Sequence, residues 1–281
     1  MLGVVGTSLS AIFARWSTAP SLVLVFYRMI FSAVLLLPVM ISCRQEFSRL
    51  RPREGALCLL SGLFLGLHLT CYFESLRFTS IASSVVLVDT EVLFVALAMR
   101  LIFHRPLGRR AWLAILLAFG GSVAVALADG STGGAAVVKG DMIALAGAFF
   151  MAVYTMLGAV CRRHISTTVY TSLVYLAAAG TVLCITLASG QPVAGYGPVN
   201  LLTALGLAVF CTLLGHSIFS WGLKYFSPAF ISTVKLLSAV FSVVWGILLF
   251  REVPGALVVF GSAFVLAGIA LYCSLDSESS S

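Results

Sequence analysis

The sequence predicts an all-α polytopic membrane protein in which ten transmembrane helices form a five-plus-five repeat of inverted topology. Three observations predict this fold: the composition, the spacing of apolar stretches, and a match between the two halves. Of the 281 residues, 60% are hydrophobic and 10% are charged, and the mean hydropathy is +1.10. Because an average soluble domain has about 25% charged residues, this composition indicates a chain that lies largely in a bilayer.

Ten apolar stretches have about the length that a membrane-crossing helix needs. An α-helix rises about 1.5 Å per residue, so about 20 residues cross roughly 30 Å of hydrocarbon. Pro20, Pro198, Pro228 and Pro254 stand at or just before starts of these stretches, where a missing N–H costs little. The predicted spans are 2–18, 21–43, 54–75, 80–103, 109–128, 140–161, 168–189, 199–223, 228–250 and 254–274.

The polar stretch after the fifth span divides the chain into near-equal halves. We expect residues 1–128 to form the first repeat, 129–139 a periplasmic connection, and 140–274 the second repeat. The remaining residues, 275–281, are polar and predict a disordered cytoplasmic tail.

The positive charges in the loops indicate the orientation. If the N-terminus is cytoplasmic, the inner loops hold Arg44, Arg49, Arg51, Arg53, Arg105, Arg109, Arg110, Arg162, Arg163 and Lys224, and the outer loops hold Arg15, Arg77, Lys139 and Arg251. Because inner loops are enriched in Lys and Arg, both termini are predicted to be cytoplasmic. The net charge of +7 therefore reflects membrane topology and not a nucleic-acid partner.

A shift of 147 residues superposes the fourth span on the ninth without a gap. It pairs Leu76 with Leu223, Arg77 with Lys224, Ser80 with Ser227, Phe94 with Phe241, Phe103 with Phe250 and Gly121 with Gly268. An odd number of spans in each half makes the second half enter the membrane from the opposite side. Secondary transporters use such inverted repeats to build a site at the midplane between the halves.

Three charged residues, Asp89, Glu91 and Lys235, lie near the middle of these matching spans. A charge at that depth costs at least about 2.5 kcal/mol unless it faces a partner or a wet cavity. For Asp89 and Lys235, three interpretations stay open: a structural ion pair between the repeats, a gated pair for which substrate or proton competes, and separate roles. On a straight helix Asp89 and Glu91 differ by about 200°, so we expect only one of them to face a cavity squarely.

Six further polar or aromatic residues are candidates for the same pathway. Arg28 either extends its charge to the interface or anchors an anionic group or an internal carboxylate. His68, which shares a face with Tyr72, is either a hydrogen-bonded packing residue or a proton relay or ligand contact. On the eighth and sixth spans, His216, Trp221 and Tyr154 either line a cavity or pack as ordinary aromatic residues.

Several other kinds of chemistry have no support in the sequence. The seven cysteines are scattered without a CxxC pattern, which favours packing over disulfides or metal sites. We find no nucleotide-binding loop, HExxH or GxSxG motif, so neither catalysis nor a cofactor is expected.

The segments SLSAIFAR and FYR, LHLTCYFESLRFTSIASSVVLV, and GHSIFSWGLKYFSP resemble the EamA-type drug/metabolite transporter superfamily over nearly the whole chain. The resemblance implies ten helices, a central cavity lined mainly by helices 1–4 and 6–9, and peripheral helices 5 and 10. It also implies a bacterial inner-membrane location, and members mostly export amino acids, other small metabolites or drugs. The family usually has a proline in the middle of helices 4 and 9, whereas this chain has Val92 and Ala239. We therefore expect the usual helix breaks to be absent, and the neighbouring charges suggest a substrate with charges of its own, such as a zwitterionic amino acid.

Together these features predict a secondary, ATP-independent transporter, with export of small metabolites or amphipathic drugs by alternating access. Its expected partners are a small-molecule substrate and the lipid bilayer, without nucleic acid, and formation of a homodimer stays open. The alternatives are a non-transporting membrane subunit and a membrane-embedded lipid-processing enzyme. The predicted pathway residues are Arg28, His68, Tyr72, Asp89, Glu91, Tyr154, His216, Trp221 and Lys235.

Overall fold

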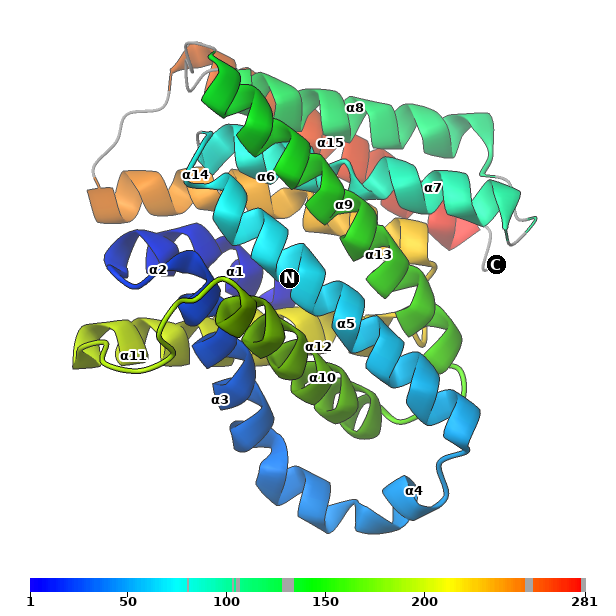
Figure 1. Cartoon of the computed structure of the whole chain (residues 1–281). Coiled ribbons are helices and arrows are strands. Elements are labelled where there is room, and N and C mark those ends of the chain that lie inside the picture. Colours follow the sequence, from blue (N-terminus) through cyan, green and yellow to red (C-terminus); the bar gives the residue numbers. More distant parts are fainter. Residues whose placement is uncertain (80, 103, 105–106, 128–133, 251–254, 279–281) are drawn as a thin grey trace.

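A computed structural model describes residues 1–79, 81–102, 104, 107–127, 134–250 and 255–278, and every regular element in these ranges is helical (Figure 1). The first half contains α1 (Leu2–Ser8), α2 (Ser10–Trp16), α3 (Ser21–Ser42), α4 (Arg44–Ser48), α5 (Pro52–Ser75), α6 (Ile81–Asp89), α7 (Glu91–Leu101) and α8 (Arg109–Leu127). The second half contains α9 (Ala135–Cys161), α10 (Thr167–Ala188), α11 (Pro198–Gly206), the π-helix η1 (Leu207–His216), α12 (Ser217–Gly222), α13 (Pro228–Lys235), α14 (Leu237–Phe250) and α15 (Ala256–Glu278).

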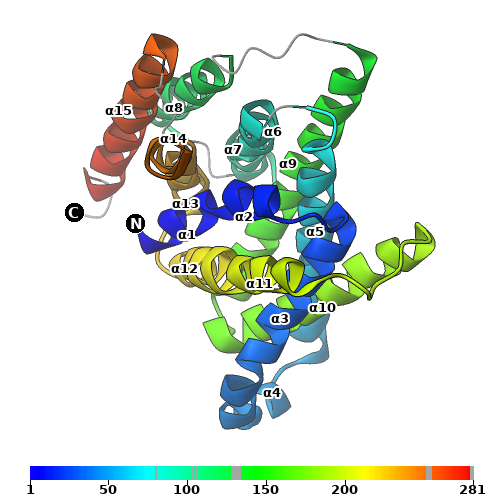
Figure 2. The same cartoon turned by 90° about the vertical axis from the view of Figure 1, so that its left-hand side faces the viewer.

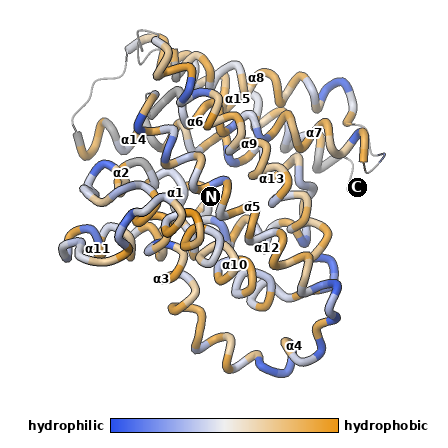
Figure 3. Tube along the Cα trace, in the orientation of Figure 1, coloured by the Kyte–Doolittle hydropathy of each residue, from blue (hydrophilic) through white to orange (hydrophobic). Residues whose placement is uncertain are grey.

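The distribution of apolar residues shows that the protein lies in a membrane. Five helical stretches are long and apolar enough to cross a bilayer: 21–42, 52–75, 135–161, 167–188 and 198–222. Large hydrophobic side chains such as Leu101, Leu248 and Phe260 are exposed on the outside, whereas Arg28 and Glu91 are buried. Apolar residues dominate the trace in Figure 3 along most helices. This arrangement suits a lipid-facing exterior around a partly polar interior.

All ten predicted ranges contain helix, but four of them are interrupted within the part of the chain that the structure describes. The first range is broken at Leu9, the fourth at Thr90 and the ninth at Leu236, and the eighth contains the π-helix η1. The expectation that the fourth and ninth helices lack a break is therefore wrong.

The break at Thr90 forms without a proline. The Thr90 hydroxyl donates to the Leu87 carbonyl at 2.6 Å, and the Thr90 N–H donates to the same carbonyl at 3.3 Å. This i to i−3 bond tightens the helix locally, and the hydroxyl competes for a carbonyl that would accept the next helical bond.

The corresponding break in the second half lies at Leu236. Its N–H donates to the Thr233 carbonyl at 3.1 Å, and the Ala239 N–H donates to the Leu236 carbonyl at 3.2 Å. Both bonds span three residues, so the chain again makes a tight turn between two α-helices. Shifted by 147 residues, Leu236 corresponds to Asp89, one residue from the first break.

Two predicted boundaries need correction. Helix α9 already begins at Ala135, so residues 135–139 of the connection predicted over 129–139 are helical; residues 128–133 lie outside the described ranges. Helix α15 continues to Glu278, so disorder predicted from residue 275 is wrong for 275–278, and 279–281 lie outside the description. Adding a residue to an existing helix is easier than starting one, so an apolar helix extends into its polar end.

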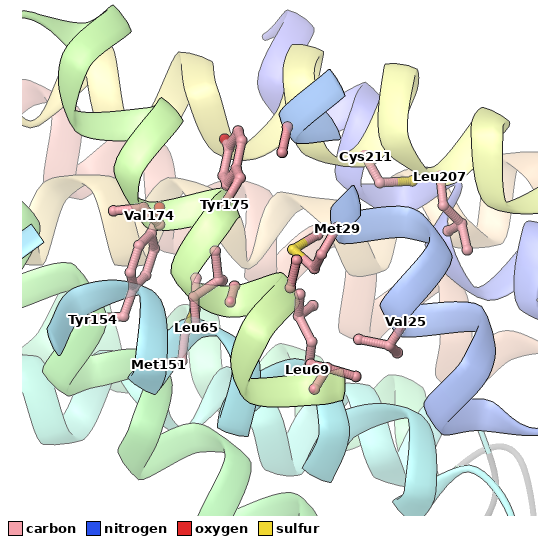
Figure 4. Close-up of a cluster of buried hydrophobic side chains, with 14 of the residues drawn as sticks. Val25, Met29, Leu65, Leu69, Met151, Tyr154, Val174, Tyr175, Leu207 and Cys211 are labelled. Atoms are coloured by element: carbon pink, nitrogen blue, oxygen red, sulfur yellow. The ribbon is translucent and has the colours of Figure 1, made fainter. Parts of the chain in front are cut away.

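Helix α5 lies at the centre of the main packed core, between α9 and α10 (Figures 1 and 2). Gly62 and Gly66 face α10 so closely that a Cβ atom on Gly62 would lie 2.4 Å from the Val174 carbonyl oxygen. Figure 4 shows the adjoining cluster, in which Met29 of α3 and Leu65 of α5 are buried near Tyr175 of α10. These contacts hold the helices that carry Arg28 and His68.

Helices α8 and α15 pair along one edge of the molecule (Figures 1 and 2). A Cβ atom on Gly121 would lie 2.5 Å from the Gly261 carbonyl oxygen and 2.7 Å from the Val265 nitrogen. A Cβ atom on Gly268 would meet Ala114 and Ala118 at 2.7 and 2.5 Å. The two sets of contacts are related by the 147-residue shift, since 114, 118 and 121 become 261, 265 and 268.

Candidate functional site

A cavity of about 100 Å³ lies inside the helical bundle and collects most of the charged residues predicted from the sequence. Seven of the nine predicted pathway residues line it: Arg28, His68, Tyr72, Asp89, Glu91, His216 and Lys235. The remaining lining residues are Thr7, Ser8, Ser10, Leu69, Val85, Val88, Met151, Phe219 and Ser238. Within the described ranges, neither α8 nor α15 contributes to the lining.

Glu91 and Lys235 form a buried ion pair between the two halves. Lys235 Nζ lies 3.0 Å from Glu91 Oε1 and 3.3 Å from Oε2. Glu91 Oε1 also accepts hydrogen bonds from the hydroxyls of Thr155 and Ser232, each at 2.8 Å. Buried charges are tolerated when they are paired and their remaining hydrogen bonds are satisfied, and Glu91 meets both conditions.

Of the three interpretations of Asp89 and Lys235, separate roles agrees with the described contacts, because Lys235 pairs with Glu91 and not with Asp89. The cause is the break at Thr90, which lets both acids reach the cavity, against the expectation from a straight helix. Lys235 has further contacts with the Thr155 hydroxyl at 3.4 Å and with the Phe219 ring, whose centroid is 5.6 Å from Nζ. The helix end of α13 thus places the ammonium between the two halves.

Arg28 is only 1% exposed, so its charge does not extend to the membrane interface. Its Nε donates to the Thr212 hydroxyl at 2.8 Å, and Nη1 contacts the Ser10 hydroxyl at 3.5 Å. In the described part of the chain, no carboxylate forms an ion pair with Arg28. Thr212 lies in the π-helix η1, and α1 packs closely against the same helix. A Cβ atom on Gly6 of α1 would lie 2.4 Å from the Phe210 carbonyl oxygen of η1.

Asp89 ends α6 and lines the cavity together with Val85 and Val88, which precede it on the same helix. Its Oδ2 atom is buried and has no hydrogen-bond partner among the described residues. Asp89 therefore differs sharply from Glu91, two residues away, whose carboxylate is saturated.

The two buried histidines occupy different environments. His68 Nδ1 lies 3.0 Å from the Gly147 carbonyl oxygen, and its ring is parallel to that of Tyr72 with centroids 6.4 Å apart. His216 contacts the ring of Tyr154 edge-on at 6.2 Å, and its Nδ1 has no hydrogen-bond partner in the described ranges. His68 is thus held in position, whereas His216 has an unused polar atom at the cavity.

Tyr154 and Trp221 do not line the cavity. The Tyr154 hydroxyl lies 3.0 Å from Ser220 Oγ, and the Tyr154 ring packs against His216 outside the cavity lining. Trp221 is 50% exposed and contacts the ring of Tyr225 at 4.9 Å, on the outer surface of the bundle. Trp221 is on one helical stretch with His216, but its side chain faces away from the interior.

Sequence reasoning missed the hydroxyl residues that complete the charged contacts: Ser10, Thr155, Thr212 and Ser232. Ser232 precedes Lys235 by three residues and therefore shares its helical face, a signal that the spacing contained. Thr155 and Thr212 are brought in from other helices, and no spacing within the sequence links them to Glu91 or Arg28.

A lipid-facing exterior around a cavity that contains charges of both signs defines a multi-pass membrane protein with a polar interior. A model of the EamA-like transporter family matches residues 1–127 and again residues 138–274. The chain therefore belongs to the EamA-like transporter family and is a membrane transporter, as the resemblance predicted.

A relative that is an exporter agrees with this assignment, and a solved structure shares the fold. The pseudopaline exporter CntI of Pseudomonas aeruginosa, from strains UCBPP-PA14 and PAO1, is 27% identical over 259 residues, which cover 91% of this chain and 87% of the relative. A crystal structure of another protein has the same fold, with a TM-score of 0.81 at 15% identity, covering 98% of this chain and 96% of that one.

Proposed function

We propose that this protein exports a small polar metabolite across the bacterial inner membrane by alternating access. The observation that carries this proposal is the cavity itself, in which Arg28, Asp89, Glu91 and Lys235 are enclosed by helices from both halves. Charges are retained in membrane interiors chiefly where substrates or ions pass. The direction is taken from CntI, which is described as an exporter.

The architecture in this proposal is a five-plus-five inverted repeat of ten membrane-crossing helices. Three observations support it: the family model matches each half separately, the breaks at Thr90 and Leu236 lie within one residue of equivalent places, and Gly121 and Gly268 make equivalent contacts. The excess of Lys and Arg in alternate loops supports cytoplasmic termini. The two halves can then exchange roles around the cavity.

The size of the cavity favours a small substrate over a drug-sized one. Pockets for drug-sized ligands usually enclose about 300–1,000 Å³, whereas this cavity encloses about 100 Å³. An amphipathic drug would require the bundle to open considerably, but a small polar metabolite fits with modest rearrangement.

Within this mechanism, we assign Glu91 and Lys235 a positioning role. Their ion pair joins α7 to α13, and the Thr155 hydroxyl adds α9. Because Glu91 Oε1 contacts Lys235, Thr155 and Ser232 at once, this pair holds the broken helices in register.

The experiment is substrate counterflow in proteoliposomes. Purified protein is reconstituted with a panel of unlabelled small metabolites inside, and uptake of the matching radiolabelled compounds is measured. We expect saturable exchange of at least one polar metabolite, without ATP. Vesicles without protein serve as the control for passive leak. If the folded protein exchanges no member of the panel, the transport proposal fails.

A further inference from the structure

An arginine occupies equivalent places in the two halves, away from the cavity. Arg15 lies in the last turn of α2, Arg162 directly follows the last residue of α9, and the 147-residue shift superposes the two. In the proposed topology, Arg15 is at the outer end of the bundle and Arg162 is at the cytoplasmic end. Their surroundings differ, because Arg162 is only 2% exposed whereas the side chain of Arg15 is exposed.

Arg162 joins the cytoplasmic ends of α9 and α12. Its Nε donates to the Ser220 carbonyl at 3.0 Å, and its Nη1 donates to the Ile165 carbonyl in the turn that leads to α10. A cation near the C-terminal end of a helix is favourable, and a charged donor makes a stronger hydrogen bond than a neutral one. Arg162 thus holds the turn after α9 against α12.

The Ser220 carbonyl is available to a side chain because the backbone does not use it. The last carbonyls of a helix have no intrahelical donor and need other partners. After α12, the Leu223 N–H donates to the Phe219 carbonyl at 3.0 Å. The Lys224 N–H then donates to the Trp221 carbonyl at 3.2 Å. Both bonds pass over the carbonyl between these two acceptors, and an arginine takes it.

Helix α5 ends in the same way in the first half. The Leu76 N–H donates to the Tyr72 carbonyl at 3.4 Å, and the Arg77 N–H donates to the Glu74 carbonyl at 3.1 Å. The 147-residue shift converts these two bonds into the two that follow α12. They pass over the Phe73 carbonyl, and no backbone N–H of a described residue donates to it. The outer end of α5 therefore presents the same kind of carbonyl as the cytoplasmic end of α12.

A carboxylate next to this carbonyl adds a reason for a cation to bind at the outer end. Glu74 Oε2 pairs with Arg77 at 3.0 Å, whereas Glu74 Oε1 is buried and has no hydrogen-bond partner among the described residues. The equivalent residue in the second half is Trp221, so the acid is specific to the outer end. A guanidinium there could contact both the Phe73 carbonyl and the carboxylate.

The helices that carry the two arginines have different forms. The stretch of α1 and α2 is broken at Leu9, whereas α9 continues without a break through Met156, which the 147-residue shift places on Leu9. One chain thus contains two forms of the same repeat element. In one form the arginine holds the neighbouring helix, and in the other its side chain is exposed.

We propose that the two arginines are alternating gates. Arg162 closes the cytoplasmic end in the structure described, and Arg15 closes the outer end by binding the Phe73 carbonyl and Glu74 when the cytoplasmic end opens. This inference deepens the proposed transport function and rests on it. When the two halves exchange roles, α1 and α2 take the continuous form of α9, and this change brings Arg15 to the end of α5.

The test is hydrogen–deuterium exchange of the purified full-length protein, followed by mass spectrometry. In Arg162→Gln, we expect faster deuterium uptake at 220–226 and slower uptake at 73–79. Loss of a charge-assisted hydrogen bond changes the ratio of the two forms by roughly tenfold, in favour of the form with a closed outer end. An arginine with a merely structural role would not slow uptake at the opposite end. Arg163→Gln is the matched control, since it removes the same charge from an exposed neighbour.

A second substitution identifies the outer gate. Adding Arg15→Gln to Arg162→Gln should abolish the slower uptake at 73–79, and adding Glu74→Gln should abolish part of it. Arg162→Lys keeps the charge but lacks the planar fork that reaches two carbonyls. It should shift uptake in the same directions by a smaller amount, so the test remains decisive if the Gln variant does not fold.

Two results overturn the inference. In one, the Arg162 variants do not slow uptake at 73–79; in the other, the slower uptake persists when Arg15→Gln is added. Either result leaves the transport proposal intact if the wild-type protein shows saturable counterflow. Absence of counterflow by folded wild-type protein would instead remove the transport proposal, so the two failures are distinguishable.

Discussion

The internal repeat is symmetric at the edge of the molecule, where α8 packs on α15, but it is not symmetric at the central cavity. At the α8–α15 edge, Gly121 and Gly268 make equivalent contacts with equivalent residues. At the cavity, the 147-residue shift places neutral residues opposite every charge: Tyr175 for Arg28, Leu236 for Asp89, Ser238 for Glu91 and Val88 for Lys235. The comparison teaches that a symmetric scaffold encloses an asymmetric site.

The largest expected effect comes from removing one partner of the buried Glu91–Lys235 ion pair. Lys235→Met leaves Glu91 buried without its cation, and we expect the free energy of unfolding to fall by roughly 3–5 kcal/mol. The measurement is the thermal unfolding midpoint in detergent. The double variant Glu91→Gln/Lys235→Met is expected to recover most of the loss, because no charge is then uncompensated. A double variant as unstable as Lys235→Met would contradict a mainly structural pair.

The next effect tests the symmetry of the edge. Gly121→Ala and Gly268→Ala each place a methyl group against backbone, so we expect each to lower the stability by about 1–3 kcal/mol. The two losses should be similar, because the contacts are equivalent. Gly120→Ala is the control, since no atom lies within 4 Å of its added Cβ. Unequal losses of stability in thermal unfolding would show that the two glycine contacts are not energetically equivalent.

A smaller effect is expected at the break that distinguishes Asp89 from Glu91. Thr90→Val keeps the side-chain shape but removes the hydroxyl bond to Leu87, for a stability change of about 1 kcal/mol. The rate of substrate exchange should fall by more than the loss of folded protein alone would cause, because a straighter helix turns Asp89 away from the cavity. Thr186→Val removes a comparable bond in the uninterrupted helix α10 and should leave exchange unchanged. Equal losses in both variants would remove the break from the mechanism.

The smallest effect is expected outside both regions. Trp221 is half-exposed and contacts Tyr225 on the surface, so Trp221→Ala should change stability by no more than about 0.5 kcal/mol. Counterflow by this variant should equal that of the wild type. A strong loss of exchange would place part of the substrate pathway outside the cavity described by the seven residues.

The sequence was sufficient to predict the helical ranges and seven of the sixteen residues that line the cavity. Apolar stretches, proline positions and the 147-residue shift depend on local chemistry, and they located Asp89, Glu91, Lys235 and Arg28 in one region. The pairing was not predictable in this way, because it depends on a single tight turn at Thr90. The shared hydrogen bonds of a threonine and its carbonyl rotate one helix segment against the next, and ideal helical geometry cannot anticipate that rotation.

The same limit explains the position of Trp221. It follows His216 by five residues, and the sequence placed both near one face of a regular helix. The structure inserts the π-helix η1 immediately before this segment, and it leaves Trp221 half-exposed while His216 is buried. Interruptions of this kind form when neighbouring helices approach closely, as α1 does at Gly6, so they depend on tertiary contacts.

The most direct test compares the unpaired charge with the saturated pair in one assay. Counterflow of a radiolabelled metabolite that the wild type exchanges is measured for Asp89→Asn and for Glu91→Gln/Lys235→Met, each corrected for the amount of folded protein. We predict that Asp89→Asn abolishes saturable exchange and that the double variant retains it. The opposite outcome, with exchange retained by Asp89→Asn and lost by the double variant, would show that Glu91 and Lys235 meet the substrate.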